Sequence, residues 1–188
     1  MKSTLESLSK ASKAICAASI VLLSIITSTK ITAQTTVPIE RDSVINAARE
    51  IISHVKYCAL ITVDSTGTAN VRTMNPFPPE EDMSVWMATN SHTRKYDEIK
   101  KNPKVTLYYA NHAAVEGYVA ITGKAVLVDD NAEKQKRKRD YWDQAFPDWK
   151  YLILIKVIPE RIEVINYKHQ MNNSTLTWRA PFTELKKP

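Results

Sequence analysis

The sequence predicts a mainly β fold, a small antiparallel barrel with helices on its outside. Short apolar and β-branched segments bounded by turn residues recur along the chain, whereas helical patterns are few. The sequence has no βαβ repeat, and no glycine fingerprint follows its first predicted strand, which argues against a Rossmann nucleotide-binding unit. A chain of 188 residues without internal repeats is expected to form one domain.

The N-terminal segment differs from the rest of the chain. Lys2, Lys10 and Lys13 give it a basic start, residues 14–27 form an apolar run, and the small residue Ala33 precedes Gln34. This is the pattern of a secretory signal peptide cleaved near Ala33, so we expect export to the periplasm or the medium. The apolar run is short for a bilayer span, so no stable membrane anchor is expected, and an uncleaved anchor remains the alternative. The expected divisions are a signal peptide (1–33), a linker (34–41), a main domain (42–180) and a C-terminal tail (181–188).

Net charge and cysteine content exclude some classes of function. The formal net charge of +6 falls to +3 without residues 1–33, which carry four lysines and one glutamate, and that is too little to indicate nucleic-acid binding. Much of the excess lies in the basic run 134–139, expected to be the solvated face of a helix, with contact to anionic lipid or a partner as the alternative. Cys58 is the only cysteine after residue 33, so no intramolecular disulfide can form there, and its apolar strand indicates a core residue.

The main domain begins with a helix and a hairpin. Apolar residues recur with helical spacing across 44–53, and Asp42 and Ser43 precede them as candidate caps. A β-branched strand over 57–63, a turn over 64–67 and a strand over 68–74 predict a hairpin.

The rest of the domain alternates strands with short helices. Three prolines make 75–82 a loop rather than a strand, and Gly123 marks an expected bend or bulge in its strand. Pro159 is expected to separate the last two strands. The expected elements are strands over 83–89, 105–110, 118–128, 151–158 and 161–167, and helices over 93–101 and 131–143.

Two polar blocks predict a site. Residues 72–77 and 86–95 each start in an apolar strand and then become hydroxyl, amide and cationic. In the second block Thr93, Arg94 and Lys95 open the predicted helix, where backbone N–H groups and the positive end of the helix dipole favour an anion. Arg offers a planar fork and Lys a point charge, and both suit a phosphate. Arg72 on the preceding strand is expected to approach the same anion.

The order of these motifs resembles the pyridoxamine 5′-phosphate oxidase-like family, the FMN-binding split barrels, over roughly residues 42–180. The resemblance implies a six-stranded antiparallel split β-barrel that forms a homodimer and holds FMN between its subunits. It is closer to the short general stress protein branch than to the true oxidases. The residues that carry the resemblance are Arg72-Thr-Met, Thr89-Asn-Ser-His-Thr-Arg-Lys95, Asn102-Pro-Lys-Val105, Ile121-Thr-Gly-Lys-Ala125 and Ile158-Pro-Glu-Arg-Ile-Glu163.

The resemblance also implies roles for particular residues. Arg94 and Lys95 would hold the FMN phosphate, supported by Thr93 or Thr89, and residues 72–75 would run beside the isoalloxazine ring. No catalytic side chain is assigned. The full implied cofactor-binding set is Arg72, Thr73, Met74, Asn75, Thr89, Thr93, Arg94, Lys95, Tyr118 and Arg179.

The sequence departs from the true oxidases at three positions. Phe77 stands where they carry a Lys, Ile165 where they carry a Trp, and Thr175 where an Arg would meet the substrate phosphate. Oxidation of pyridoxamine phosphate is therefore not expected. The sequence indicates an FMN-dependent oxidoreductase with an unidentified small-molecule substrate or electron donor, or alternatively a non-catalytic flavin- or haem-binding protein for storage or sensing.

The remaining histidine and aromatic residues are not assigned to the cofactor site. His92, His112 and His169 lack the spacing of metal ligands, so no metal site is predicted. In a haem-binding alternative, His112 or His169 would be the axial ligand. Trp142, Phe146 and Trp149 are expected to pack the 131–149 segment.

Overall fold

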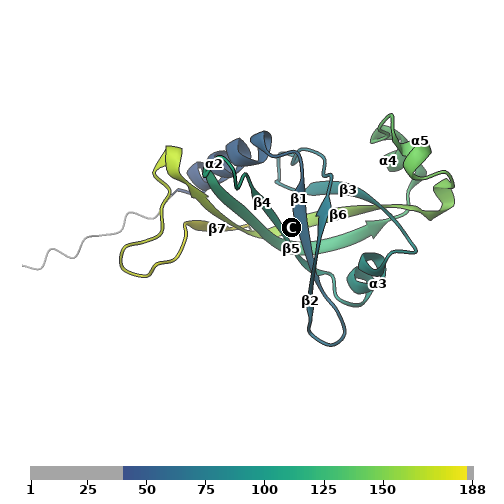
Figure 1. Cartoon of the computed structure of the whole chain (residues 1–188), viewed down its shortest axis with the longest axis horizontal. Helices are drawn as coiled ribbons and strands as arrows, with labels where there is room; N and C mark the ends of the chain where they lie inside the picture. The colour runs from purple at the N-terminus through teal and green to yellow at the C-terminus, as the bar shows by residue number, and fades with distance from the viewer. Residues whose placement is uncertain (1–39, 186–188) are drawn as a thin grey trace, which may run out of the picture. The chain divides into compact units, whose positions relative to one another are not determined.

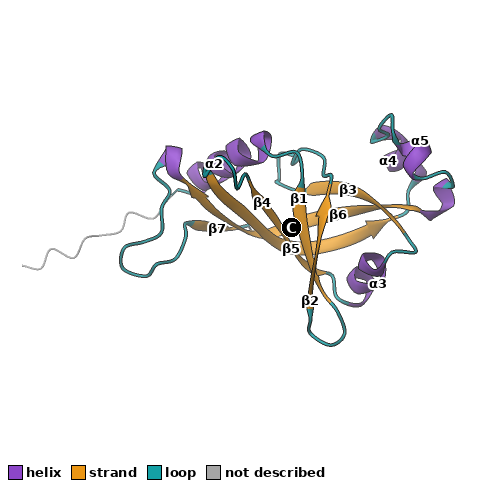
Figure 2. Ribbon diagram, in the orientation of Figure 1, coloured by secondary structure: helices purple, strands orange, loops and turns teal. Residues whose placement is uncertain are grey.

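The computed structural model describes residues 40–185, which form a strongly curled antiparallel sheet with helices beside it (Figures 1 and 2). The predicted signal peptide and residues 34–39 of the predicted linker lie outside the described residues. The strands are β1 Cys58–Val63, β2 Ala69–Met74, β3 Val85–Asn90, β4 Lys104–Ala110, β5 Gly117–Val128, β6 Leu152–Asn166 and β7 Phe182–Glu184.

The sheet order is β2-β1-β4-β5-β6-β3, every pair is antiparallel, and β7 adds to β6. The two end strands, β2 and β3, do not pair with each other, so the sheet curls into a half-barrel that stays open along one side. This confirms the predicted split barrel. β7 lies in the segment that the sequence analysis assigned to a C-terminal tail, and it adds a short seventh strand.

Helix α2 (Arg41–His54) packs against β4, β5 and β6. Its predicted apolar face is buried in the main core: Val44, Ala47, Ala48, Ile51 and Ile52. The N-cap is Glu40 rather than the predicted pair Asp42 and Ser43, because the helix starts earlier and includes both. Asp42 then lies in the first turn, where the positive end of the helix dipole stabilises its carboxylate.

The two strands expected on either side of Pro159 are one continuous strand, β6. Pro159 lies opposite Gly123 of β5, where the register of the β5–β6 pair shifts. A bulge tolerates the missing proline N–H, so the strand continues through it. Gly123 is required there, because a Cβ at this position would overlap the carbonyl oxygen of Ile158. The predicted bulge at Gly123 is confirmed, but the strand break at Pro159 was wrong.

The predicted helix 131–143 is broken into α4 (Asn131–Lys136) and α5 (Trp142–Ala145), followed by η1 (Trp149–Tyr151). Trp142, Phe146 and Trp149 pack together, as predicted, in a second core over β3 and β6. The basic run 134–139 is not a uniformly solvated face, because Lys134 and Arg137 are buried. Lys134 pairs with Asp129 at 2.5 Å, and Arg137 stacks on the Trp86 ring at 3.9 Å.

Helix α3 (Arg94–Lys101) follows β3 directly, and the short helix η2 (Tyr167–His169) follows β6. Cys58 is buried in the main core, as predicted, and burial raises the pKa of its thiol to about 12 although the neighbouring Tyr109 hydroxyl opposes this. None of the described helices is both long enough and apolar enough to span a membrane.

Candidate functional site

The start of α3 is set by a threonine turn. Thr93 is the N-cap in an extended conformation, and its hydroxyl donates to the Asn90 carbonyl oxygen at 2.8 Å rather than accepting from the helix. The Thr93 and Thr89 hydroxyl oxygens lie 3.2 Å apart. The Tyr96 N–H donates to the Thr93 carbonyl oxygen at 2.9 Å. Because the cap makes no side-chain hydrogen bond to the first turn, the N–H groups of Arg94 and Lys95 keep their capacity to bind an anion.

Arg72 of β2 is directed toward this helix. Its Nη2 donates to Glu98 Oε2 at 2.7 Å, and its Nη1 donates to Thr62 Oγ1 at 2.5 Å. The Thr62 hydroxyl in turn donates to the same carboxylate at 2.5 Å. Burial opposes ionisation of Glu98, but the hydrogen bonds from Thr62 and Arg72 outweigh it and hold the pKa of Glu98 below its ordinary value. Glu98 therefore acts as a buried carboxylate that holds Arg72 in place.

Arg94 and Lys95 complete the cluster. Arg94 Nε lies 3.0 Å from Glu98 Oε1, but without the alignment of a hydrogen bond, and the Arg94 side chain is 71% exposed. Lys95 is half-buried, and burial together with the positive charge of Arg72 lowers its pKa, although Glu98 opposes this. Three predicted cations thus meet around one carboxylate, which leaves an excess of positive charge.

The other predicted residues lie in different surroundings. Thr73 is exposed on the outer face of β2, Met74 is buried in the main core, and Asn75 borders a pocket. Tyr118 packs on Tyr108 with ring centroids 5.6 Å apart and belongs to a separate aromatic group. Burial, with the carboxylate of Glu163 beside its hydroxyl, raises the pKa of Tyr118 to about 12.

The predicted residues near the C-terminus are exposed. Arg179 lies in the loop between η2 and β7, where its backbone N–H donates to Thr177 Oγ1 at 3.4 Å. Within residues 40–185, Glu98 pairs with Arg72 and Arg94 and not with Arg179. Trp178 is 79% exposed.

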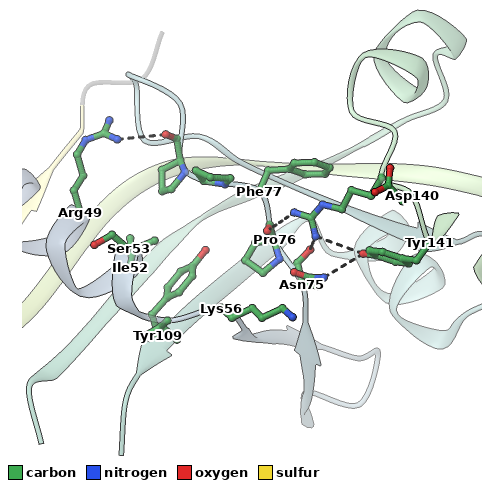
Figure 3. A pocket seen from close by; sticks show the side chains of 14 residues that line it. Arg49, Ile52, Ser53, Lys56, Asn75, Pro76, Phe77, Tyr109, Asp140 and Tyr141 are labelled. Carbon is green, nitrogen blue, oxygen red and sulfur yellow. Dashed lines mark hydrogen bonds between the residues drawn. The ribbon is translucent and has the colours of Figure 1, made fainter. Parts of the chain in front are cut away.

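A pocket of about 970 Å³ opens beside the segment that follows β2 (Figure 3). Its walls come from the end of α2, the proline-rich segment 75–79, Tyr109 of β4, and residues 139–141. Phe77 forms part of it, whereas Tyr118, one of the residues with an implied cofactor-binding role, does not.

Arg139 and Tyr141 fix one wall of this pocket. Arg139 donates to the carbonyl oxygens of Asn75 (3.3 Å) and Pro76 (2.7 Å) and stacks on Phe77 at 4.0 Å. Asn75 Nδ2 donates to the Tyr141 hydroxyl at 3.2 Å. Burial would raise the pKa of Tyr141, but the hydrogen bond and charge of Arg139 prevail and lower it. Arg49 of α2 fixes the opposite wall by donating to the Glu80 carbonyl oxygen at 2.6 Å.

The histidines are engaged elsewhere. His92 packs on Tyr151 with centroids 4.2 Å apart, His112 stacks on Tyr108, and His169 contacts Glu50. Across residues 40–185, no cluster of three or more His, Cys, Asp or Glu side chains is arranged to hold a metal ion.

Sequence reasoning missed Glu98, Thr62, Arg139 and Tyr141. Glu98 had a readable signal, because it stands four residues after Arg94 on the same helix, a spacing that brings opposite charges together. Thr62 and Arg139 had none, because their partners are 10 and more than 60 residues away in sequence. Tyr141 was hidden because residues 131–143 were read as one helix.

Comparisons with known proteins agree with this fold. Residues 43–177 match the sequence model of the family described as pyridoxamine 5′-phosphate oxidase like. General Stress Protein 26 from Bacillus anthracis is 24% identical, with a TM-score of 0.56, and the match covers 64% of this chain and 92% of that one. A protein related to general stress protein 26 from Clostridium acetobutylicum is 18% identical, with a TM-score of 0.62, covering 78% of this chain and 97% of that one.

A heme binding protein from Mycobacterium smegmatis has the same fold, with 13% identity and a TM-score of 0.58, covering 78% of this chain and 60% of that one. At these identities the likeness to solved structures concerns the fold alone. No curated protein sequence matches this chain. The family model, however, spans most of the chain, and the protein belongs to the pyridoxamine 5′-phosphate oxidase-like family.

Proposed function

We propose that this protein binds FMN and is a flavin-dependent oxidoreductase acting on a small molecule other than pyridoxamine phosphate. The observation that carries the proposal is the meeting of Arg72, Arg94 and Lys95 at the start of α3. Family membership supports a flavin as the ligand, because Arg94 and Lys95 are the residues to which the resemblance assigns the FMN phosphate.

The donors at this site fit a phosphate. Arg94 has an exposed guanidinium, Lys95 is half-buried at its side, and the first N–H groups of α3 are not bonded by the cap side chain. A phosphate carries close to two negative charges, which the excess positive charge of the cluster would neutralise. Arg72 is held by Glu98 and Thr62, so we assign it a positioning role rather than direct phosphate contact.

Beyond the phosphate, the chain runs from Arg72 along β2 to the pocket at Asn75. At about 3.4 Å per residue, three residues of strand span roughly 10 Å, a suitable length for an extended ligand. FMN, when bound, supplies reversible hydride or electron transfer. Asn75, Pro76 and Phe77 would then place one face of the ring against the pocket.

The same segment argues against pyridoxamine phosphate as the substrate. Phe77 carries no charge, and the N–H groups of its neighbour Arg139 donate to backbone carbonyl oxygens. Thr175 is exposed and uncharged. A phosphate bound beside Phe77 and Thr175 would lose part of its hydration, and neither of these residues supplies the cation that would replace it. FMN-loaded protein is expected to produce no pyridoxal phosphate, and turnover near about 10 per second would contradict this.

The test of the cofactor site compares FMN with riboflavin, which lacks the phosphate. Charge-assisted hydrogen bonds contribute roughly 1.5–3 kcal/mol each, so Arg94→Ala is expected to weaken FMN binding about tenfold to a hundredfold. Riboflavin should bind wild-type protein poorly, and its affinity should be nearly the same for Arg94→Ala. Lys101→Ala, at the other end of α3, is the matched control and should leave both affinities unchanged.

Fluorescence titration measures both affinities, and equal losses for FMN and riboflavin would show that Arg94 acts through structure instead. The absorbance spectrum of the purified protein separates flavin from haem. Bleaching by a reductant and recovery in air would support an oxidoreductase, whereas a flavin that does not recover would support storage or sensing.

We further propose that the protein is a homodimer with FMN between its subunits. The open half-barrel supports this, since it leaves β2 as an edge strand with Val71 61% exposed. A monomer mass by light scattering at micromolar concentration would contradict it.

We propose finally that the protein is exported and begins near Gln34. The basic start and apolar run of residues 1–33 support this. Mass spectrometry of secreted or periplasmic protein measures the N-terminus, and an intact Met1 in the cytoplasm would contradict the proposal.

A further inference from the structure

The pocket of about 970 Å³ contains an unpaired hydrogen-bonding group at its floor. Tyr109 of β4 is fully buried, and among the described residues its hydroxyl has no partner with hydrogen-bond geometry. Figure 3 shows its ring directed from β4 into the pocket, toward the residues of α2 and of segment 75–79. The thiol of Cys58 neighbours this hydroxyl, but a thiol is only a weak hydrogen-bonding partner. A buried polar group without a partner is costly, so its presence beside a pocket points to a ligand.

The hydroxyl is available as a donor. Burial, with the neighbouring Cys58 adding to the effect, raises the pKa of Tyr109 well above its ordinary value. The group therefore keeps its proton throughout the physiological range and would donate to an acceptor such as a carbonyl oxygen. The side chains that line the pocket include Ile52, Val55 and Phe77, which suit a flat apolar ligand.

The mouth of the pocket carries positive charge. Arg49, Lys56 and Arg139 line the pocket against a single acid, Asp140. The two arginines are bonded to backbone carbonyl oxygens, as described above. Lys56 is exposed, and within residues 40–185 its ammonium group forms no ion pair, although it lies 5.3 Å from the Tyr57 ring centroid. Lys56 is thus the cation that is free to meet an anionic group.

We propose that this pocket binds a flat aromatic acid, whose carbonyl oxygen accepts a hydrogen bond from Tyr109 and whose anionic group pairs with Lys56. A volume of about 970 Å³ is within the range of small-molecule sites, which hold predominantly apolar ligands fixed by a few polar groups. Binding itself rests only on the pocket. That the ligand is the redox substrate rests on the proposed function, because Asn75, Pro76 and Phe77 border both the pocket and the proposed ring site.

Anthraquinone-2-sulfonate is a suitable probe, because it combines a flat ring system, carbonyl oxygens and an anion. Anthracene-2-sulfonate lacks the carbonyl oxygens, and 2-(hydroxymethyl)anthraquinone lacks the charge. Isothermal titration calorimetry measures each affinity for wild type, Tyr109→Phe, Lys56→Gln and the control Tyr108→Phe. Tyr108 is the neighbouring residue of β4 on the opposite face, where it packs on Tyr118.

Loss of one neutral hydrogen bond should weaken anthraquinone-2-sulfonate about fivefold to tenfold in Tyr109→Phe and leave anthracene-2-sulfonate unchanged. Lys56→Gln should weaken both sulfonates about twofold to fivefold and leave the neutral quinone unchanged. Tyr108→Phe should change none of them. Equal effects of Tyr109→Phe on all three probes, or no binding by wild type, would overturn the proposal.

Titrations with and without FMN separate this proposal from the cofactor assignment. If the protein does not bind FMN but the three probes show the expected affinity changes in the variants, the pocket proposal is supported and the proposed flavin function is wrong. If FMN binds as expected but Tyr109→Phe and Lys56→Gln leave all probe affinities unchanged, the assignment of the cofactor site is supported and the pocket proposal is wrong. Near-identical circular dichroism spectra of the four proteins exclude misfolding as the cause.

Discussion

The guanidinium of Arg72 and the carboxylate of Glu98 lie 2.7 Å apart, with the side chain of Arg94 on the solvent side of the same carboxylate. One buried acid thus holds a strand cation and a helix cation together. Because Glu98 is buried, water cannot replace Arg72 as its partner without a large cost in free energy. The pair therefore fixes the distance between β2 and α3, and with it the shape of the proposed phosphate site.

Glu98→Gln is expected to destabilise the fold and strengthen cofactor binding. The change leaves the partly buried Arg72 without its counter-charge, which should lower the free energy of unfolding by about 2–3 kcal/mol. It also removes the only carboxylate of the cluster, so FMN should bind about threefold to tenfold more tightly while riboflavin is unaffected. Urea denaturation and fluorescence titration measure the two effects.

Asp97→Asn is the matched control for Glu98→Gln, because it makes the same charge change at the adjacent exposed position. It should leave stability within about 0.5 kcal/mol of wild type. Weaker FMN binding in Glu98→Gln would show that the carboxylate supports the phosphate site by positioning Arg72 more than it opposes the phosphate by its charge.

The cations of this site could be predicted from the sequence, and the spacing of Glu98 from Arg94 was a readable signal, but the contact of Glu98 with Arg72 was not. Arg94 and Lys95 are adjacent and follow an apolar strand, so local pattern was enough to place them at a helix start. The contact of Arg72 with Glu98 joins residues 26 apart and depends on the side of β2 that faces α3. Which side of β2 faces α3 depends on the curvature of the sheet, and local sequence patterns do not predict that curvature.

The sheet was predictable to a similar extent. Apolar and β-branched segments located the six main strands, and β1, β4 and β5 bury alternate residues as such segments predict. The edge strand β2 buries only Met74. Pro159 suggested a break, and only the cross-strand position of Gly123 explains why β6 continues. The basic run 134–139 was misread because charge indicates solvent on average, whereas Arg137 is buried by stacking on Trp86 and pairing with Glu80.

Arg137→Ala is expected to loosen the second core. Arg137 contacts Glu133 and lies 2.6 Å from Glu80. Its loss removes the ion pair of Glu133, leaves Glu80 with the more distant Lys156 at 3.7 Å, and exposes the face of Trp86. The free energy of unfolding should fall by about 2–4 kcal/mol. Lys136→Ala, one position earlier and exposed, should change it by less than about 0.5 kcal/mol. Similar losses in both variants by urea denaturation would mean that helix propensity, not the Arg137 contacts, explains the effect.

Gly123→Ala should be more damaging than Gly67→Ala, although both place a methyl group on a turn or bulge glycine. At Gly123 the new Cβ would overlap the Ile158 carbonyl oxygen, so β5 and β6 must separate locally, at a cost of about 3 kcal/mol. At Gly67 the space is open, and only the positive φ of 86° is unfavourable, at about 1 kcal/mol. Thermal unfolding followed by circular dichroism ranks the two, and the reverse ranking would contradict the proposed role of the bulge.

Glu50 links α2 to η2 and is expected to make stability depend on pH in the acid range. It contacts Lys168 and His169, and hydrogen bonds from these two side chains lower the pKa of Glu50 to about 2 from an ordinary value of 4.5. A carboxylate whose pKa is depressed by folding stabilises the folded state above the unfolded pKa. The contribution of Glu50 should thus be complete above about pH 4.5 and disappear as the pH falls toward about 2.

Thermal unfolding of wild type and Glu50→Gln across this range tests the link between α2 and η2. Wild type should have the higher Tm above pH 4.5, and the two Tm values should converge as the pH approaches 2, because protonated Glu50 resembles glutamine in charge. Glu81→Gln is the matched control, since this exposed glutamate makes no ion pair within residues 40–185, and its Tm difference from wild type should stay small at every pH. A Tm difference for Glu50→Gln that persists unchanged to pH 2 would assign its effect to packing of α2 rather than to the charge of Glu50.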